Sequence, residues 1–136
     1  MQSTNNGYRH IWLLAGTGEG PLLANTLSEE GWEVTVSVVS AQASWPFLEM
    51  SATSVFVGAI QGPEGIKEIL RKAEYLHGGF DWVIDATHPF AVEISSNLQK
   101  SCNELNQPLL RFERPNEDIP GTFLIENLID FSNYCF

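Results

Sequence analysis

Short apolar runs, separated by glycines and polar stretches, recur along this chain. The run "IWLLAG" is apolar throughout, whereas in "WEVTVSVVS" the valines Val34, Val36 and Val38 alternate with other residues. Both patterns are typical of β-strands, and a run that is apolar throughout indicates a strand buried on both faces of a parallel sheet. The predicted strands are 11–16, 32–40, 55–60, 81–86 and 107–115.

Between these strands, apolar residues recur every three or four positions, which is the spacing of one face of a helix. The first helix is predicted after the turn at 16–20, with Pro21 in its first turn and Gly31 at its end. The others are predicted over 62–79 and 88–106. The expected core faces are Leu22, Leu23, Thr26 and Leu27; Ile66, Ile69, Leu70, Ala73 and Leu76; and Phe90, Ile94, Leu98, Cys102 and Leu105.

Strands that alternate with helices predict an α/β fold, here a Rossmann-like, doubly wound parallel sheet in three layers. The segment 41–54 lacks clear periodicity, and we expect a loop there with at most a short turn of helix. Residues 1–114 are expected to form a nucleotide-binding domain. Residues 115–136 are expected to form a linker and the beginning of a second, incomplete α/β domain, with a sixth strand that runs into a short helix.

Composition excludes several classes of function. The formal net charge of the 136 residues is -10, which argues against nucleic acid or an anionic membrane as a partner. No apolar run approaches the about 20 residues of a membrane-spanning helix, so we expect a cytoplasmic protein. We also expect the protein to be a monomer. Cys102 and Cys135 have no zinc-site spacing, and the three histidines form no metal motif. Both cysteines are expected to be reduced packing residues.

The turn "AGTGEGP" places Gly16, Gly18 and Gly20 between the first strand and the first helix. Glycines there let the backbone approach a phosphate, which the amides of the helix N-terminus then bind. The spacing is not GxGxxG, because Pro21 stands at the last position, and a plain tight turn is the alternative. A carboxylate beside a phosphate is unfavourable, so we expect Glu19 to cap the helix or bind a ribose hydroxyl. The candidate cofactor-binding residues of the turn are Gly16, Thr17, Gly18 and Glu19.

The end of the second strand bears on the choice of nucleotide. A site that prefers NAD usually offers an acid there, whereas this chain has "SVVS". The lack of an acid favours NADP or no dinucleotide at all. With no arginine nearby, Ser37 and Ser40 are the residues expected to meet a 2′-phosphate.

The segment "DATHPFA" follows the fourth strand, at the edge where parallel sheets bind ligands. We expect Asp85, Thr87 and His88 to face the same crevice as the glycine turn. Each residue also has a structural alternative: Thr87 could be a helix N-cap, Pro89 a first-turn proline and His88 a surface residue. Asp85 could be an acid that only holds a neighbouring loop in place. His88 and Asp85 are the candidate catalytic residues because either can transfer a proton, and Thr87 is a candidate cofactor contact.

The segments "IWLLAGTGEG", "EVTVSVVS", "WVIDATHPFAVEIS" and "PLLRFERP" together resemble, in that order, the precorrin-6A reductases of cobalamin biosynthesis, including the cobalt-precorrin-6A type. The resemblance runs from about residue 11 to residue 115, and "DATHPFA" is its most specific part. It implies two α/β domains and NAD(P)H-dependent reduction of one carbon–carbon double bond in a tetrapyrrole. The implied cofactor is NADPH, with NADH possible.

The same resemblance implies roles for further residues. Pro89 and Phe90 would line the substrate cleft, and Arg111 and Arg114 would pair with carboxylates of the tetrapyrrole. The chain departs from the family at Pro21, where an arginine is usual, and it is shorter than family members. The protonating group would be His88, Asp85 or water. A non-catalytic nucleotide-binding or sensing module is the alternative function.

Overall fold

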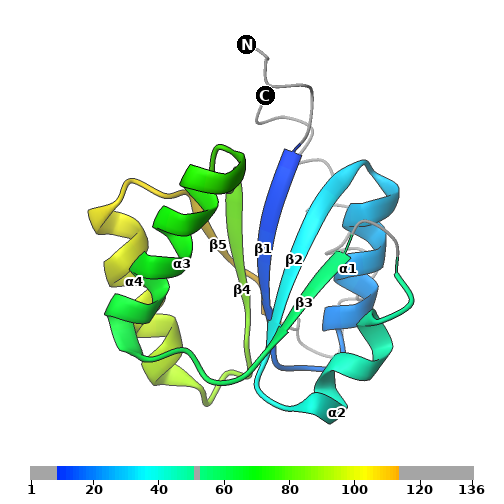
Figure 1. Ribbon diagram of the computed structural model, residues 1–136. Coiled ribbons are helices and arrows are strands. Elements are labelled where there is room, and N and C mark those ends of the chain that lie inside the picture. The colour runs from blue at the N-terminus through cyan, green and yellow to red at the C-terminus, as the bar shows by residue number, and fades with distance from the viewer. Residues whose placement is uncertain (1–8, 51–52, 114–136) are drawn as a thin grey trace.

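The computed structural model describes residues 9–50 and 53–113, which form a parallel sheet of five strands (Figure 1). The order across the sheet is β3-β2-β1-β4-β5. The chain therefore moves outward from β1 to one side and then crosses back to β4 on the other, which is the predicted doubly wound topology. The strands are β1 (Arg9–Ala15), β2 (Trp32–Val38), β3 (Thr53–Val57), β4 (Trp82–Ala86) and β5 (Leu109–Arg111).

Helices cover both faces of the sheet and complete the three predicted layers (Figure 1). One face carries α1 (Gly20–Glu29) and α2 (Ala41–Ser44), the latter continued by a 3-10 turn at Trp45–Phe47. The other face carries α3 (Gly62–His77) and α4 (Val92–Glu104). None of the helices in the described ranges combines the length and apolar character needed to span a bilayer.

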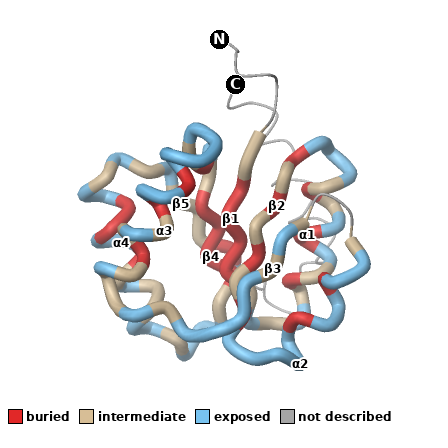
Figure 2. Tube along the Cα trace, viewed as in Figure 1, coloured by how far each residue is buried: buried red, intermediate tan, exposed pale blue. Residues whose placement is uncertain are grey.

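The core has two parts, one on each face of the sheet. In β1 the side chains alternate between them, because successive residues of a strand point to opposite faces. Ile11 and Leu13 pack toward α1, whereas Trp12 and Leu14 pack toward α3 and α4. Figure 2 shows the resulting concentration of buried residues along β1 and β4 at the centre of the sheet. These two central strands provide the rigid frame on which the loops at their carboxyl ends are mounted.

Glycines end two helices as the sequence predicts. Gly31 follows α1 with φ +98°, and Gly78 caps α3 with φ +91°. Both angles lie in the left-handed region, which glycine adopts at low steric cost. The short helical turns at 41–47 also agree with the expectation of a loop that contains little helix.

The start of α4 differs from the prediction. The helix begins at Val92, not at His88, and its N-cap is Ala91, so Thr87 is not the cap and Pro89 is not in the first turn. The residue before a proline is disfavoured in helical conformation, which keeps His88 out of the helix. Phe90 consequently lies outside the helical face and is 86% exposed, so its assignment to the core was wrong.

Other boundaries and core positions also shift. β3 spans Thr53–Val57 instead of 55–60, because Gly58 leaves the strand with φ +133°. β5 is limited to three residues that pair with β4. Leu22 and Leu76 are exposed rather than buried. The predicted sixth strand and second domain, at 115–136, lie outside the described residues and remain predictions.

Candidate functional site

A cavity of about 670 Å³ opens where β1, β2, β3 and β4 end. It lies at the carboxyl edge of the sheet, beside the switch point between β1 and β4, where ligands of doubly wound proteins bind. Of the predicted site residues, the cavity brings together Gly16, Ser37, Thr87, His88 and Phe90. Within the described ranges, neither arginine nor lysine lines it. An anionic ligand here would therefore depend on backbone N–H groups and on neutral side-chain donors such as the hydroxyl of Ser37.

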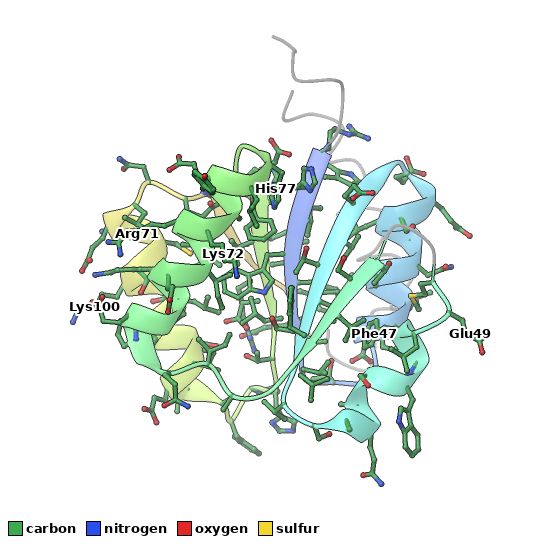
Figure 3. The ribbon with its side chains drawn as sticks, in the orientation of Figure 1. Phe47, Glu49, Arg71, Lys72, His77 and Lys100 are labelled. Atoms are coloured by element: carbon green, nitrogen blue, oxygen red, sulfur yellow. The ribbon has the colours of Figure 1, made fainter. Side chains whose placement is uncertain are left out.

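The cations of the helical layer lie away from this cavity. Arg71 of α3 and Lys100 of α4 project outward from their helices, far from the ends of β1 and β2 (Figure 3). Lys67, on the same layer, pairs with Glu64 and Glu104. These charges lie on the helical surface, so they do not supply an anion site at the strand ends.

The glycines of the first turn meet different surroundings. A Cβ on Gly16 would stand 3.0 Å from the backbone nitrogen of His88 and 3.1 Å from Cα of Thr87. One on Gly20 would stand 2.9 Å from Cβ of Ala15. Both glycines are thus required by close packing. A Cβ on Gly18 would meet nothing within 4 Å among the described residues, and Gly18 does not have a positive φ.

Neither close packing nor backbone conformation therefore requires a glycine at position 18. The space beside it lies at the start of α1, where backbone N–H groups point outward and favour an anion. This is the arrangement expected if a phosphate group approaches the chain at Gly18. Glu19 was predicted either to cap α1 or to bind a ribose hydroxyl. It does occupy the N-cap position of α1, but its side chain makes no capping hydrogen bond within the described part of the chain.

The glycine turn contacts the segment after β4. The backbone N–H of Gly16 donates to the carbonyl of Ala86 at 3.2 Å, and Gly16 packs directly against Thr87 and His88. The prediction that the turn and "DATHPFA" share one edge is confirmed for Gly16, Thr87 and His88. Thr17, Gly18 and Glu19 are on the same turn but outside the wall of the cavity.

Asp85 lies beneath this edge instead of facing the cavity. It is 3% exposed, and its carboxylate accepts hydrogen bonds from Thr87, Ser95 and Arg111. Arg111 Nε also contacts Glu113 at 3.3 Å. The structure thus places Arg111 in contact with acids of its own chain. Ser95, which sequence reasoning missed, is ten residues from Asp85 and meets it only because α4 packs back over β4.

His88 and Phe90 form the exposed part of the segment. Their rings are tilted by 40° with centroids 5.1 Å apart, and the backbone N–H of Phe90 donates to His88 Nδ1 at 3.1 Å. Because Nδ1 accepts this hydrogen bond, the neutral imidazole carries its proton on Nε2. Pro89 is exposed between them.

The serines after and within β2 already have partners. Ser37 Oγ accepts a hydrogen bond from the buried indole of Trp12 at 2.8 Å, and its own O–H can still donate toward the cavity. Ser40 Oγ caps α2 by accepting from the N–H of Ala43. Arg114 lies outside the described residues, so its predicted role remains untested.

Cys102 is buried against this region and behaves as the packing residue that was predicted. Burial, and then the nearby carboxylate of Asp85, raise the pKa of the Cys102 thiol to about 11. A thiol with so high a pKa is a poor nucleophile and a poor metal ligand. Among the residues that the structure covers, no cluster of three or more histidines, cysteines or acids is arranged to hold a metal ion.

Sequence comparisons with known proteins show similarity to an enzyme family. Residues 10–134 match the family model described as Precorrin-6x reductase CbiJ/CobK. The chain is 38% identical over 116 residues to a precorrin-6A reductase of Mycobacterium tuberculosis, covering 85% of this chain and 43% of the relative. It is 33% identical over 125 residues to a cobalt-precorrin-6A reductase of Methanococcus maripaludis, covering 87% and 46%.

A solved structure described as CobK precorrin-6A reductase has the same fold, with a TM-score of 0.66 at 27% identity, covering 83% of this chain and 42% of that chain. The chain spans less than half the length of these relatives. The matched region nevertheless contains the glycine turn, the segment after β4 and the strand that carries Arg111. The chain therefore belongs to the precorrin-6x reductase CbiJ/CobK family.

Proposed function

We propose that this chain binds a nicotinamide dinucleotide at the carboxyl edge of its sheet and forms the cofactor-binding part of a precorrin-6A reductase. The observation that carries the proposal is the open space at Gly18, on the same turn as Gly16, which lines the cavity together with His88. The pyrophosphate would lie against the backbone of the turn at Thr17 and Gly18, because the N–H groups of Gly16 and Gly20 already donate to the carbonyls of Ala86 and Thr17. Glu19 would face a ribose hydroxyl and not the phosphates. A cavity of about 670 Å³ falls in the range typical of sites for small molecules and cofactors.

The preferred nucleotide is proposed to be NADPH, with NADH as the weaker ligand. NAD-preferring sites usually place a carboxylate at the end of the second strand, whereas here this strand ends with Ser37 and Val38, followed by Val39 and Ser40. The hydroxyl of Ser37 faces the cavity and can donate to a 2′-phosphate. Ser40 already caps a helix and is the less suitable of the two.

The proposed reaction is the reduction of one carbon–carbon double bond of precorrin-6A or cobalt-precorrin-6A. The reduced nicotinamide supplies hydride when it is bound. For the proton we propose His88 or water, because Asp85 is buried and bound by neighbouring donors. His88 would present its Nε2–H to the cleft, since Nδ1 is engaged by Phe90.

The substrate is proposed to pack against Pro89 and Phe90. Both residues are exposed, and Phe90 lines the cavity. The ring of Phe90 offers an aromatic face to a flat macrocycle. Because Arg111 pairs with Asp85, carboxylates of the substrate would need other cations, of which Arg114 is a candidate. We also propose that the protein is a monomer, as the sequence predicts.

A titration of the 136-residue chain with NADPH and NADH, followed by tryptophan fluorescence, tests the proposal. Trp12 donates to Ser37 at the cavity and serves as a reporter. Gly18→Leu should weaken NADPH binding at least about tenfold, which corresponds to about 1.4 kcal/mol. Its melting temperature should remain unchanged, because the added side chain meets open space.

The matched control is Asn25→Leu, which adds a leucine to the exposed face of α1. It should bind NADPH as the wild type does. Equal affinity of Gly18→Leu and wild type would remove the glycine turn from the cofactor site.

A further inference from the structure

Asp85 is the one charged residue that is buried within the described ranges. A buried carboxylate is costly unless hydrogen-bond donors and an opposite charge compensate it. The groups that compensate the Asp85 carboxylate come from the segment after β4, from α4 and from β5, so the carboxylate links these three elements beneath the candidate site.

Both oxygens of the carboxylate are bound. Ser95 Oγ of α4 donates to Oδ2 at 2.6 Å. Oδ1 accepts from Thr87 Oγ1 at 2.6 Å, from the backbone N–H of Thr87 at 3.1 Å and from Arg111 Nη1 of β5 at 2.9 Å. Hydrogen bonds to an ionised group are about twice as strong as neutral ones and are more strictly oriented. The network therefore fixes Thr87 relative to α4 and β5.

Thr87 begins the segment that presents His88 to the cavity. Beyond it, the segment closes on itself, because the N–H of Phe90 donates to His88 Nδ1 and the N–H of Ala91 donates to the His88 carbonyl at 2.8 Å. The small turn that holds His88 is thus anchored at one end by the Asp85 carboxylate and at the other by the start of α4. Ser95 lies on the first turns of that helix and bonds to the same carboxylate.

We infer that Ser95 and Arg111, acting through Asp85, are positioning residues that hold His88 and the wall of the cofactor cavity in place. This inference rests on the proposed function. Arg111 then binds the carboxylate of Asp85 instead of the substrate carboxylates that the sequence predicted as its partners. Ser95 becomes a further residue of the site. A buried ion pair contributes little net stability compared with apolar packing, but it specifies the directions of the groups that bind it.

Ser95→Ala tests the inference because it removes one hydroxyl and leaves the ion pair in place. We expect the backbone amide resonances of Thr87, His88 and Phe90 to shift in ¹H–¹⁵N spectra of the full chain. Hydrogen exchange at the Thr87 amide should become at least about tenfold faster, because its acceptor is less well held. The affinity for NADPH should fall roughly threefold to tenfold. Ser95→Thr, which keeps the hydroxyl, should restore most of both effects.

Ser96→Ala is the matched control, since it makes the same change at the exposed neighbouring position of α4. It should leave the resonances of the His88 segment and the affinity unchanged. Arg111→Lys provides a second variant that keeps the charge but not the shape of the guanidinium, and it should also perturb the Thr87 amide.

The two readouts separate this inference from the proposed function. Unchanged resonances of the His88 segment in both Ser95→Ala and Arg111→Lys would overturn the inference, and so would shifted resonances with unaltered NADPH affinity. If the wild-type chain binds no nucleotide, the proposed function fails. The amide resonances and exchange rates then still decide whether the network positions the segment.

Discussion

The two ends of the sheet each combine a histidine, an aromatic ring and an aspartate, yet the two groups are built in opposite ways. At the amino end of the strands, the rings of His10 and His77 stack with centroids 4.1 Å apart, and His77 meets Phe80 edge-on at 5.4 Å. Figure 3 places His77 at that end of β1. There Asp81 is exposed and accepts the backbone N–H of His10 at 2.8 Å.

At the carboxyl end, the acid is buried and the histidine is exposed. Asp85 is enclosed by donors from three elements, whereas His88 stands at the cavity with only Phe90 as its ring neighbour among the described residues. At the amino end, His10 is half-buried, and its ring stacks on the exposed ring of His77. The carboxyl end uses its acid as an anchor and leaves its histidine accessible to a ligand. The same residue types thus serve stability at one end and a site at the other.

The largest expected difference between the ends is in the two aspartates. Asp85→Ala should lower the free energy of unfolding by about 3 kcal/mol, because it removes the buried partner of Arg111 and breaks the hydrogen bonds from Thr87 and Ser95. Asp81→Ala removes an exposed hydrogen bond and should cost about 1 kcal/mol. Urea denaturation measures both. Equal losses in the free energy of unfolding for the two variants would show that Asp85 stabilises the fold no more than the exposed Asp81 does.

A smaller effect is expected from the pH dependence of the amino end. Burial, and then the neighbouring charge of His77, lower the pKa of His10 below its usual 6.5, against weaker opposing effects of Glu33 and Asp81. As the pH falls through 6.5, the unfolded chain takes up a proton at this position before the folded chain does. The stability associated with neutral His10 is therefore present above that pH and is lost below it.

Melting temperatures at about pH 7.5 and about pH 5.5 measure this loss. His10→Gln should lose a few degrees less than the wild type between these conditions, because it lacks the proton-binding group. An identical loss in both proteins would show that His10 does not contribute to the pH dependence.

Sequence reasoning identified the sheet and the edge of the site because both depend on local patterns. Alternating strands and helices imply a parallel sheet, and the carboxyl ends of neighbouring strands must meet at one edge. The glycine turn follows β1 and "DATHPFA" follows β4, and these strands are adjacent. Their proximity could therefore be predicted from the order of elements alone.

The interior of the site could not be predicted in the same way. Arg111 is 26 residues from Asp85, and nothing in the spacing reveals that they pair. The orientation of Phe90 was missed because helical periodicity was extended through Pro89. Leu76 was placed in the core because its spacing fits α3, but it lines an open cavity of about 540 Å³ that also includes Phe56 of β3. Periodicity identifies the apolar face of a helix and does not reveal where the sheet beneath it is left uncovered.

We propose that a dinucleotide binds at the carboxyl edge of the sheet and not at the amino edge. The most direct test is to follow the ¹H–¹⁵N spectrum of the 136-residue chain while NADPH is added. We expect saturable shifts in the amides of Gly16, Thr17, Gly18 and His88, with those of His10 and Asp81 unchanged. Shifts confined to the amino edge, or no saturable shift at millimolar NADPH, would contradict it.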